Sequence, residues 1–139
     1  MSAVRILTAL ALLSVVLGTA LAQDDVAPAE VSLEVTEMAF GTDFDRETRS
    51  LIGTATTFPA GVERLWCRTR VLGGSDPTTI THVWYRDGKT MARVELDIRS
   101  GDWRTVSSKL LLPDWTGLWE VKVLDATGTI LRSESVTVE

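Results

Sequence analysis

The chain has few of the residues on which small domains often rely for cross-links and metal sites. Its 139 residues include one cysteine, Cys67, and one histidine, His82. A single cysteine excludes a disulfide within the chain, so we expect the hydrophobic core to hold the fold. For Cys67 itself we favour a buried free thiol over an intermolecular disulfide. A single histidine excludes a metal site made of several histidines, and we expect no metal ion and no cofactor.

Positive charge is scarce as well. Lysine and arginine together number 14 against 19 aspartates and glutamates, which gives a formal net charge of −5. No basic stripe stands out along the sequence, which argues against nucleic acid and anionic membranes as partners. Helical periodicity, internal repeats and low-complexity tracts are also missing after residue 22. These absences favour one domain built from strands.

The first residues have the features of a secretory signal. Arg5 is the only charged residue before Asp24, and the apolar run from Ile6 to Leu17 is too short to span a bilayer comfortably. The small-residue site Ala20-Leu21-Ala22 follows this run. We therefore expect a signal peptide over residues 1–22 that is cleaved after Ala22, and a periplasmic or secreted protein. An uncleaved anchor is the alternative.

The rest of the chain divides into a short leader and one domain. Residues 23–29 are acidic and contain a proline, so we predict a flexible leader, followed by a domain over residues 30–139. Alternating apolar residues predict strands within 30–40, 51–58, 62–72, 79–86, 91–98, 103–111, 118–124 and 129–138. Residues 41–49 are polar and predict a loop, whereas Asp87-Gly88 predicts a tight hairpin turn. Seven or eight short strands at this spacing are typical of an all-β antiparallel sandwich.

All five tryptophans lie between Trp66 and Trp119, within a series of short motifs. The motifs are Phe58-Pro59-Ala60-Gly61, Leu65-Trp66-Cys67, His82-Val83-Trp84, Asp87-Gly88-Lys89, Trp103-Arg104, Ser107-Ser108-Lys109 and Gly117-Leu118-Trp119-Glu120-Val121. In this order they resemble the bacterial family known as Domain of Unknown Function 2914, from about Met38 to Val138. One departure is Trp66, where the family often has tyrosine. The resemblance implies an immunoglobulin-like β-sandwich in the bacterial envelope, outside the cytoplasm, and implies no activity.

Eight polar and aromatic residues are the candidates for a ligand-binding site. They are Arg70, His82, Trp84, Trp103, Arg104, Ser107, Lys109 and Trp115. Arginine and tryptophan are enriched where proteins bind partners, and an aromatic residue in a loop can stack on a sugar ring. Five of the eight would form one polar-aromatic patch if their strands converged, namely Arg70, His82, Trp84, Trp103 and Arg104. The alternative for His82 is a structural histidine that is hydrogen-bonded within the fold.

Catalytic and metal-binding constellations are weak in this sequence. Ser107 and Lys109 share one face of a predicted strand, but no glycine-rich oxyanion hole or third orienting group accompanies them. Asp43, Asp45 and Glu47 alternate as calcium ligands can, yet the segment lacks the glycine and the spacing of a calcium-binding loop. We therefore predict no catalytic residue and no metal site.

These observations favour a non-catalytic binding or interaction domain of the bacterial envelope. Its ligand would be a glycan or a protein, and the sequence does not decide between them. One alternative is a structural accessory domain of an envelope complex. A hydrolase is disfavoured because the chain lacks the catalytic groups described above. The sequence makes no prediction of an oligomeric state.

Overall fold

The computed structural model describes residues 32–74 and 76–139. The predicted signal peptide, the predicted leader and the first two residues of the predicted domain lie outside the described residues. Within the described part the chain forms ten strands and no helix. These strands are β1 (Glu34–Gly41), β2 (Asp43–Asp45), β3 (Ser50–Ile52), β4 (Thr57–Phe58), β5 (Arg64–Leu72), β6 (Thr78–Arg86), β7 (Lys89–Ile98), β8 (Asp102–Leu110), β9 (Gly117–Asp125) and β10 (Ile130–Val138). No helix that could cross a membrane occurs among the described residues.

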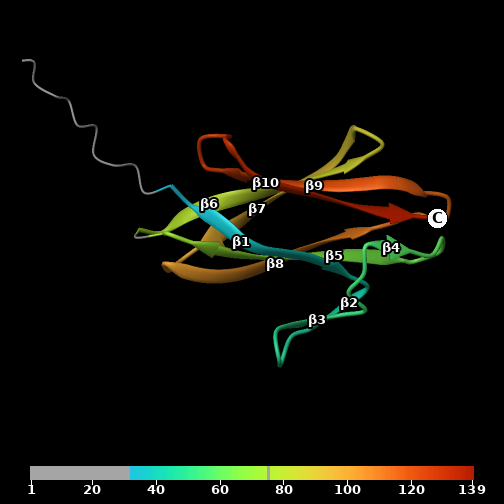
Figure 1. Cartoon of the computed structure of the whole chain (residues 1–139), viewed down its shortest axis with the longest axis horizontal. Coiled ribbons are helices and arrows are strands. Elements are labelled where there is room, and N and C mark those ends of the chain that lie inside the picture. Colours follow the sequence, from blue (N-terminus) through green and yellow to red (C-terminus); the bar gives the residue numbers. More distant parts are fainter. Residues whose placement is uncertain (1–31, 75) are drawn as a thin grey trace, which may run out of the picture.

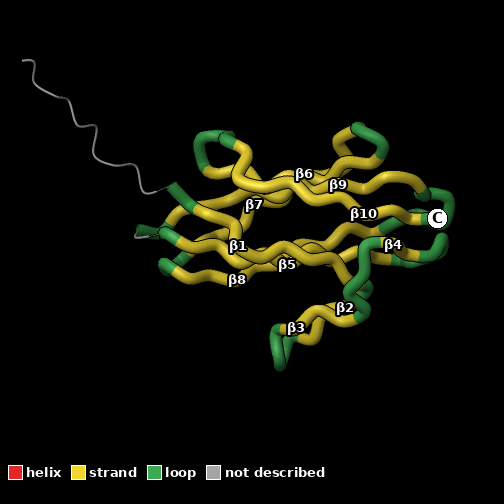
Figure 2. The backbone as a smooth tube through the Cα atoms, in the orientation of Figure 1, coloured by secondary structure: helices red, strands yellow, loops and turns green. Residues whose placement is uncertain are grey.

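The longer strands form two sheets that lie in two layers (Figures 1 and 2). One sheet has three strands in the order β1-β5-β8, and the other has five in the order β4-β10-β9-β6-β7. All neighbours are antiparallel except β4, a two-residue strand that runs parallel to β10. Strands β2 and β3 form a separate hairpin, which lies on the outer side of the three-stranded sheet (Figure 1).

The core lies between the two sheets, and the alternation along β5 shows how the sequence creates it. Leu65, Cys67, Thr69 and Val71 are buried, while the residues between them are only partly buried. Successive side chains of a strand point to opposite faces, so Trp66, Arg68 and Arg70 lie on the outer face of this sheet. From the opposite sheet, the fully buried Trp84 and Trp119 fill the centre. Truncation of either to alanine would cost about 3–5 kcal/mol of stability.

The structure confirms an all-β fold with antiparallel sheets. Seven of the predicted strands reappear as long strands with bounds shifted by a few residues. The predicted turn is also present: Asp87 and Gly88 have φ angles of 47° and 81°, as a primed hairpin turn requires. The thiol of Cys67 is fully buried, as predicted, and burial raises its pKa.

Two predictions on the segment before β5 were wrong. Residues 41–49 were predicted to be a loop but contain β2, and the single strand predicted over 51–58 is divided between β3 and β4. The β2–β3 hairpin is held by tertiary contacts that local patterning does not reveal. The ring of Phe44 stacks on Trp66 of β5, with the ring centroids 5.8 Å apart. Within the hairpin, the Thr42 amide donates to the Ile52 carbonyl at 2.9 Å.

Candidate functional site

The structure separates the eight candidate residues into three groups. His82, Trp84 and Ser107 lie in the core between the sheets. Arg70 and Arg104 are paired across β5 and β8, and Trp103 is the neighbour of Arg104 on β8. Lys109 and Trp115 lie together near the far end of β8, with the Lys109 ammonium 5.2 Å from the Trp115 ring centroid. The single patch of arginines with His82 and Trp84 therefore does not form, because β6 belongs to the opposite sheet.

The first group forms a buried chain of hydrogen bonds that joins the two sheets. The His82 Nε2 atom lies 3.1 Å from the Thr69 hydroxyl, and its Nδ1 atom lies 2.6 Å from the Ser107 hydroxyl. Trp84 Nε1 donates to the same Ser107 oxygen at 3.1 Å. Thr69 and Ser107 come from the three-stranded sheet, whereas His82 and Trp84 come from β6. Sequence reasoning could not find Thr69, since nothing in the alternation marks a buried threonine as a histidine partner.

One arrangement of protons satisfies this chain. The indole of Trp84 can only donate, so the Ser107 oxygen accepts its proton and can direct its own hydrogen to His82 Nδ1. His82 Nε2 then donates to Thr69. This order requires a neutral imidazole, and burial lowers the pKa of His82 to about 4. The chain is therefore a structural network in which the polar groups of two sheets satisfy one another.

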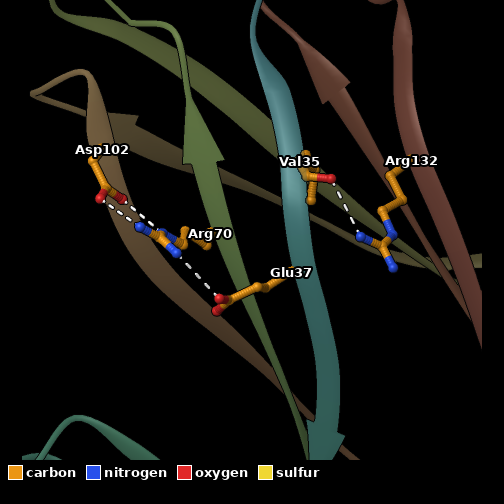
Figure 3. A network of polar contacts seen from close by, with 5 residues as sticks. All are labelled: Val35, Glu37, Arg70, Asp102 and Arg132. Atoms are coloured by element: carbon orange, nitrogen blue, oxygen red, sulfur yellow. Dashed lines mark hydrogen bonds and ion pairs between the residues drawn. The ribbon is translucent and has the colours of Figure 1, made fainter.

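On the outer face of the three-stranded sheet, Arg70 is held by two carboxylates (Figure 3). Its guanidinium makes a two-pronged contact with Asp102, at 2.9 and 2.8 Å, and reaches Glu37 at 3.2 Å. Hydrogen bonding to Arg70 lowers the pKa of Asp102, and the two carboxylates raise the pKa of Arg70. In the same view Arg132 donates to the backbone carbonyl of Val35 at 3.3 Å. Arg70 thus has its charge balanced within the protein.

Beside this balanced pair lies a groove with a different electrostatic character, which we term the arginine groove. It consists of two adjoining hollows, of about 380 Å³ and 530 Å³, between the β2–β3 hairpin, β8 and the turn before β8. Both hollows share walls formed by Arg49, Arg68, Trp103 and Arg104. The first is completed by Phe44, Arg46, Asp97, Arg99, Thr105 and Val106. The second is completed by Thr48, Ser50, Ser100 and Asp102.

Positive charge dominates this groove. Five arginines line it, against two carboxylates, and each carboxylate already pairs with an arginine: Asp97 with Arg99 at 3.2 Å, and Asp102 with Arg70. Among the described residues, no carboxylate lies within ion-pair distance of the other four lining arginines, which are Arg46, Arg49, Arg68 and Arg104. Crowding of like charges opposes folding, so these arginines carry positive charge that the described carboxylates do not balance by ion pairs.

Arg49 occupies a special place in the groove wall. It ends the turn between β2 and β3 with a φ angle of 57°, in the left-handed region that side chains other than glycine and asparagine rarely adopt. Its guanidinium donates to the Arg104 carbonyl on β8 at 3.3 Å, which ties the hairpin to the edge of the sheet. A residue held in this conformation costs of order 1 kcal/mol. A glycine would avoid that cost, so the position retains arginine at some expense to stability.

The remaining candidate residues form local contacts. The indole of Trp119 donates to the Trp115 carbonyl at 3.0 Å, and Lys109 covers the Trp115 ring. In the acidic segment, Asp45 accepts hydrogen bonds from the amides of Glu47 and Thr48, which lower its pKa. No group of three or more potential metal ligands occurs in residues 32–74 and 76–139.

The model of the family described as "Protein of unknown function (DUF2914)" matches residues 77–138. No relative was found among the curated proteins. Among solved structures, the crystal structure of an endonuclease/exonuclease/phosphatase from Beutenbergia cavernae DSM 12333 is 20% identical, with a TM-score of 0.33. That match covers 76% of this chain and 35% of the other, so the chain spans about a third of that protein, and so low a score carries no argument.

The family match runs from the residue before β6 to the end of β10. It includes seven of the eight candidate residues, all except Arg70, and it includes the β8 wall of the arginine groove. The motifs before residue 77 and the β2–β3 hairpin lie outside the matched segment. The match over residues 77–138 therefore confirms the resemblance to the DUF2914 family of proteins of unknown function.

Proposed function

We propose that this protein is an exported, non-catalytic binding domain whose ligand occupies the arginine groove. The observation that carries the proposal is the gathering of five arginines around one groove in a protein with a net charge of −5. Guanidinium groups recognise carboxylates and phosphates through two parallel hydrogen bonds. A ligand with such groups would relieve the repulsion among the arginines and would be drawn to the groove by its field.

The arrangement of the polar side chains supports a non-catalytic role. The one serine–histidine contact, between Ser107 and His82, lies in the core, where Ser107 is 5% exposed and His82 is fully buried. A nucleophile must reach its substrate, and neither group is accessible from the groove or from solvent. Lys109, the other partner considered for Ser107, instead covers Trp115.

We also propose that the fold is an immunoglobulin-like sandwich. In that class a tryptophan of the second sheet is buried against the pair of core residues that joins the two sheets. One residue of this pair lies on a later strand of the same sheet as the tryptophan. Here Trp84 of β6 is buried and lies directly opposite Val121 of β9. Two positions before that residue of the later strand, the class typically has an aromatic side chain that donates a hydrogen bond to the backbone a few residues upstream. Trp119 bonds in this way to the Trp115 carbonyl.

Export to the periplasm or the cell exterior is part of the same proposal. It is supported by the features of residues 1–22, including the Ala20-Leu21-Ala22 site, and by the envelope location that the family resemblance implies. N-terminal sequencing of the protein recovered from cells tests it. A start at Gln23 supports export with cleavage after Ala22, whereas recovery from the cytoplasm with an intact N-terminus contradicts it.

The binding role is tested with bacterial envelope material and matched charge variants. Protein expressed from the full reading frame is sedimented with washed envelope fragments. The groove variant Arg68→Ser with Arg104→Ser removes two unpaired guanidinium groups. The control variant Lys89→Ser with Arg93→Ser removes two charges from exposed positions on β7, in the opposite sheet. We expect at least a tenfold loss of binding in the groove variant alone. Equal binding by all three proteins would overturn the proposed site.

A further inference from the structure

We infer that the ligand of the arginine groove is an acidic glycan, with one anionic sugar bound in each of the two hollows. This inference rests on the proposed function and adds the chemical class of the ligand. Two features of the groove carry it: the presence of Trp103 in the walls of both hollows, and the polar groups that line the same hollows.

Trp103 offers a surface for a sugar ring. Its side chain is half-buried, packs in part against the core, and forms a wall of both hollows. Its register partner on β5 is the buried Val71, so the ring leans toward the core, and its remaining exposed part can contact the apolar face of a sugar. The backing by the core fixes the ring, so little conformational entropy is lost when a ligand binds.

The groups around Trp103 suit the rest of an acidic sugar. Arg49, Arg68 and Arg104 belong to both hollows, so an anionic group on either side of Trp103 meets unpaired guanidinium groups. The second hollow adds the hydroxyl groups of Thr48, Ser50 and Ser100, which can bond to sugar hydroxyls. Each hollow is within the size range of small-molecule sites, and the shared walls allow one chain to occupy both.

The edge of β8 argues against an acidic peptide as the ligand. A peptide strand would bind there by adding to the sheet and pairing with free backbone groups of β8. The Arg104 carbonyl already accepts a hydrogen bond from Arg49, so this backbone acceptor is not free to pair with a peptide. An added strand would have to break this contact, whereas a glycan bound by side chains leaves it in place.

The test compares ligands that vary the charge, the type of anionic group and the presence of sugars. Oligogalacturonate carries a carboxylate on every sugar, and its methyl ester has the same sugars without the charge. A phosphorylated mannan oligosaccharide replaces carboxylate by phosphate, and poly-glutamate supplies carboxylates without sugars. Titrations by calorimetry and tryptophan fluorescence use the protein expressed from the full reading frame. We expect saturable binding of at least one of the two acidic glycans, which identifies carboxylate or phosphate as the recognised group.

Five outcomes decide whether the ligand is an acidic glycan. If the carboxylate glycan is the ligand, support requires that its neutral ester binds at least tenfold more weakly than the parent glycan. Support further requires that the Arg68→Ser, Arg104→Ser variant binds the acidic glycan at least tenfold more weakly than the unaltered protein. It also requires that Trp103→Leu, with folding confirmed by thermal unfolding, weakens glycan binding severalfold. Poly-glutamate binding as tightly as the acidic glycans would overturn the inference in favour of an acidic protein segment. If neither acidic glycan binds while envelope binding still depends on the groove, the inference fails and the proposed function stands.

Discussion

The two faces of the three-stranded sheet treat polar side chains in opposite ways. On the inner face, Thr69 and Ser107 complete a chain of hydrogen bonds with His82 and Trp84, so every member is satisfied within the protein. On the outer face, Arg68 stands next to Thr69 in sequence and has no carboxylate partner among the described residues. The polar residues of the inner face therefore hold the two sheets together, whereas the unpaired arginines of the outer face would meet the proposed ligand.

Arg70 can be compared directly with Arg68, because it lies two residues further along β5 and on the same face. Its charge is balanced by Asp102 and Glu37, so the fold can neutralise an outward arginine where no ligand is needed. Ion pairs as exposed as these contribute little to stability. Arg68 and Arg70 therefore differ in whether their guanidinium groups are free to meet the proposed ligand. Their ion pairing has little effect on the stability of the protein.

The largest expected effect comes from breaking the inner face at its centre. Ser107→Ala removes the oxygen shared by His82 and Trp84 and leaves both ring nitrogens buried without a partner. Each orphaned group costs about 1–3 kcal/mol, so we expect a loss of about 4 kcal/mol in the free energy of unfolding, measured in urea. The matched control is Ser108→Ala on the outer face, which loses one bond from Arg64 and should change stability by less than about 1 kcal/mol. Similar losses in both variants would contradict the assigned role of the inner face.

Acid should weaken the same network. Because burial lowers the pKa of His82 from 6.5 to about 4, the unfolded chain binds a proton in a range where the folded chain does not. Stability is therefore complete above pH 6.5 and falls as the pH drops toward 4, by roughly 3 kcal/mol in total. The lowered pKa of Asp102 acts below this window, since its ordinary value is 3.8. Urea unfolding of His82→Gln, whose amide cannot be protonated, should lose most of the slope between pH 6.5 and 4, and a retained slope would contradict the assignment.

The inner face also offers a test of the immunoglobulin-like class. In such domains a disulfide joins the strands that correspond to β5 and β9. Cys67 of β5 and Val121 of β9 are both fully buried in the core, so in an immunoglobulin-like sandwich Val121→Cys should form a disulfide with Cys67 in air. We expect an increase of about 2 kcal/mol in stability over the reduced form. Two free thiols in the folded, oxidised variant would count against this class.

The smallest expected effect is on stability at the outer face. Arg49→Gly relieves the left-handed backbone conformation at the end of the β2–β3 turn but also removes the hydrogen bond to the Arg104 carbonyl, so we expect stability to change by less than about 1 kcal/mol. The same variant removes one guanidinium from both hollows, so binding of the acidic glycan should weaken severalfold. Binding is thus expected to change more than stability. A loss of stability together with unchanged binding would show that Arg49 serves the fold alone.

Much of the fold could be predicted from the alternation of side chains, and the failures have a physical cause. The turn at Asp87-Gly88 could be predicted because few other residue pairs adopt the required φ angles. The β2–β3 hairpin gave no such sign, because its strands are three residues long and depend on the contact of Phe44 with Trp66. Short strands that are stabilised by tertiary contacts lack a periodic pattern of their own.

The candidate site could be predicted only in part for a related reason. Alternation indicates which residues share a face of one strand, and it correctly separated Arg104 from Ser107 on β8. It does not indicate which strands pair, and that is why the arginines were grouped with His82 and Trp84 of the opposite sheet. Arg46 and Arg49 were missed because they lie on the unpredicted hairpin. A signal was nevertheless present, since residues 46 and 49 are arginines within an otherwise acidic segment.

The most direct test of the account is a map of where an acidic glycan touches the protein. Backbone and tryptophan side-chain NMR signals would be followed while the acidic oligosaccharide found by the titrations above is added. The account predicts shifts confined to residues 44–50, Arg68, and residues 99–106, with the indole of Trp103 moving and those of the buried Trp84 and Trp119 unchanged. Shifts centred on Trp115 at the far end of β8, or spread evenly over both sheets, would contradict the arginine groove as the binding site.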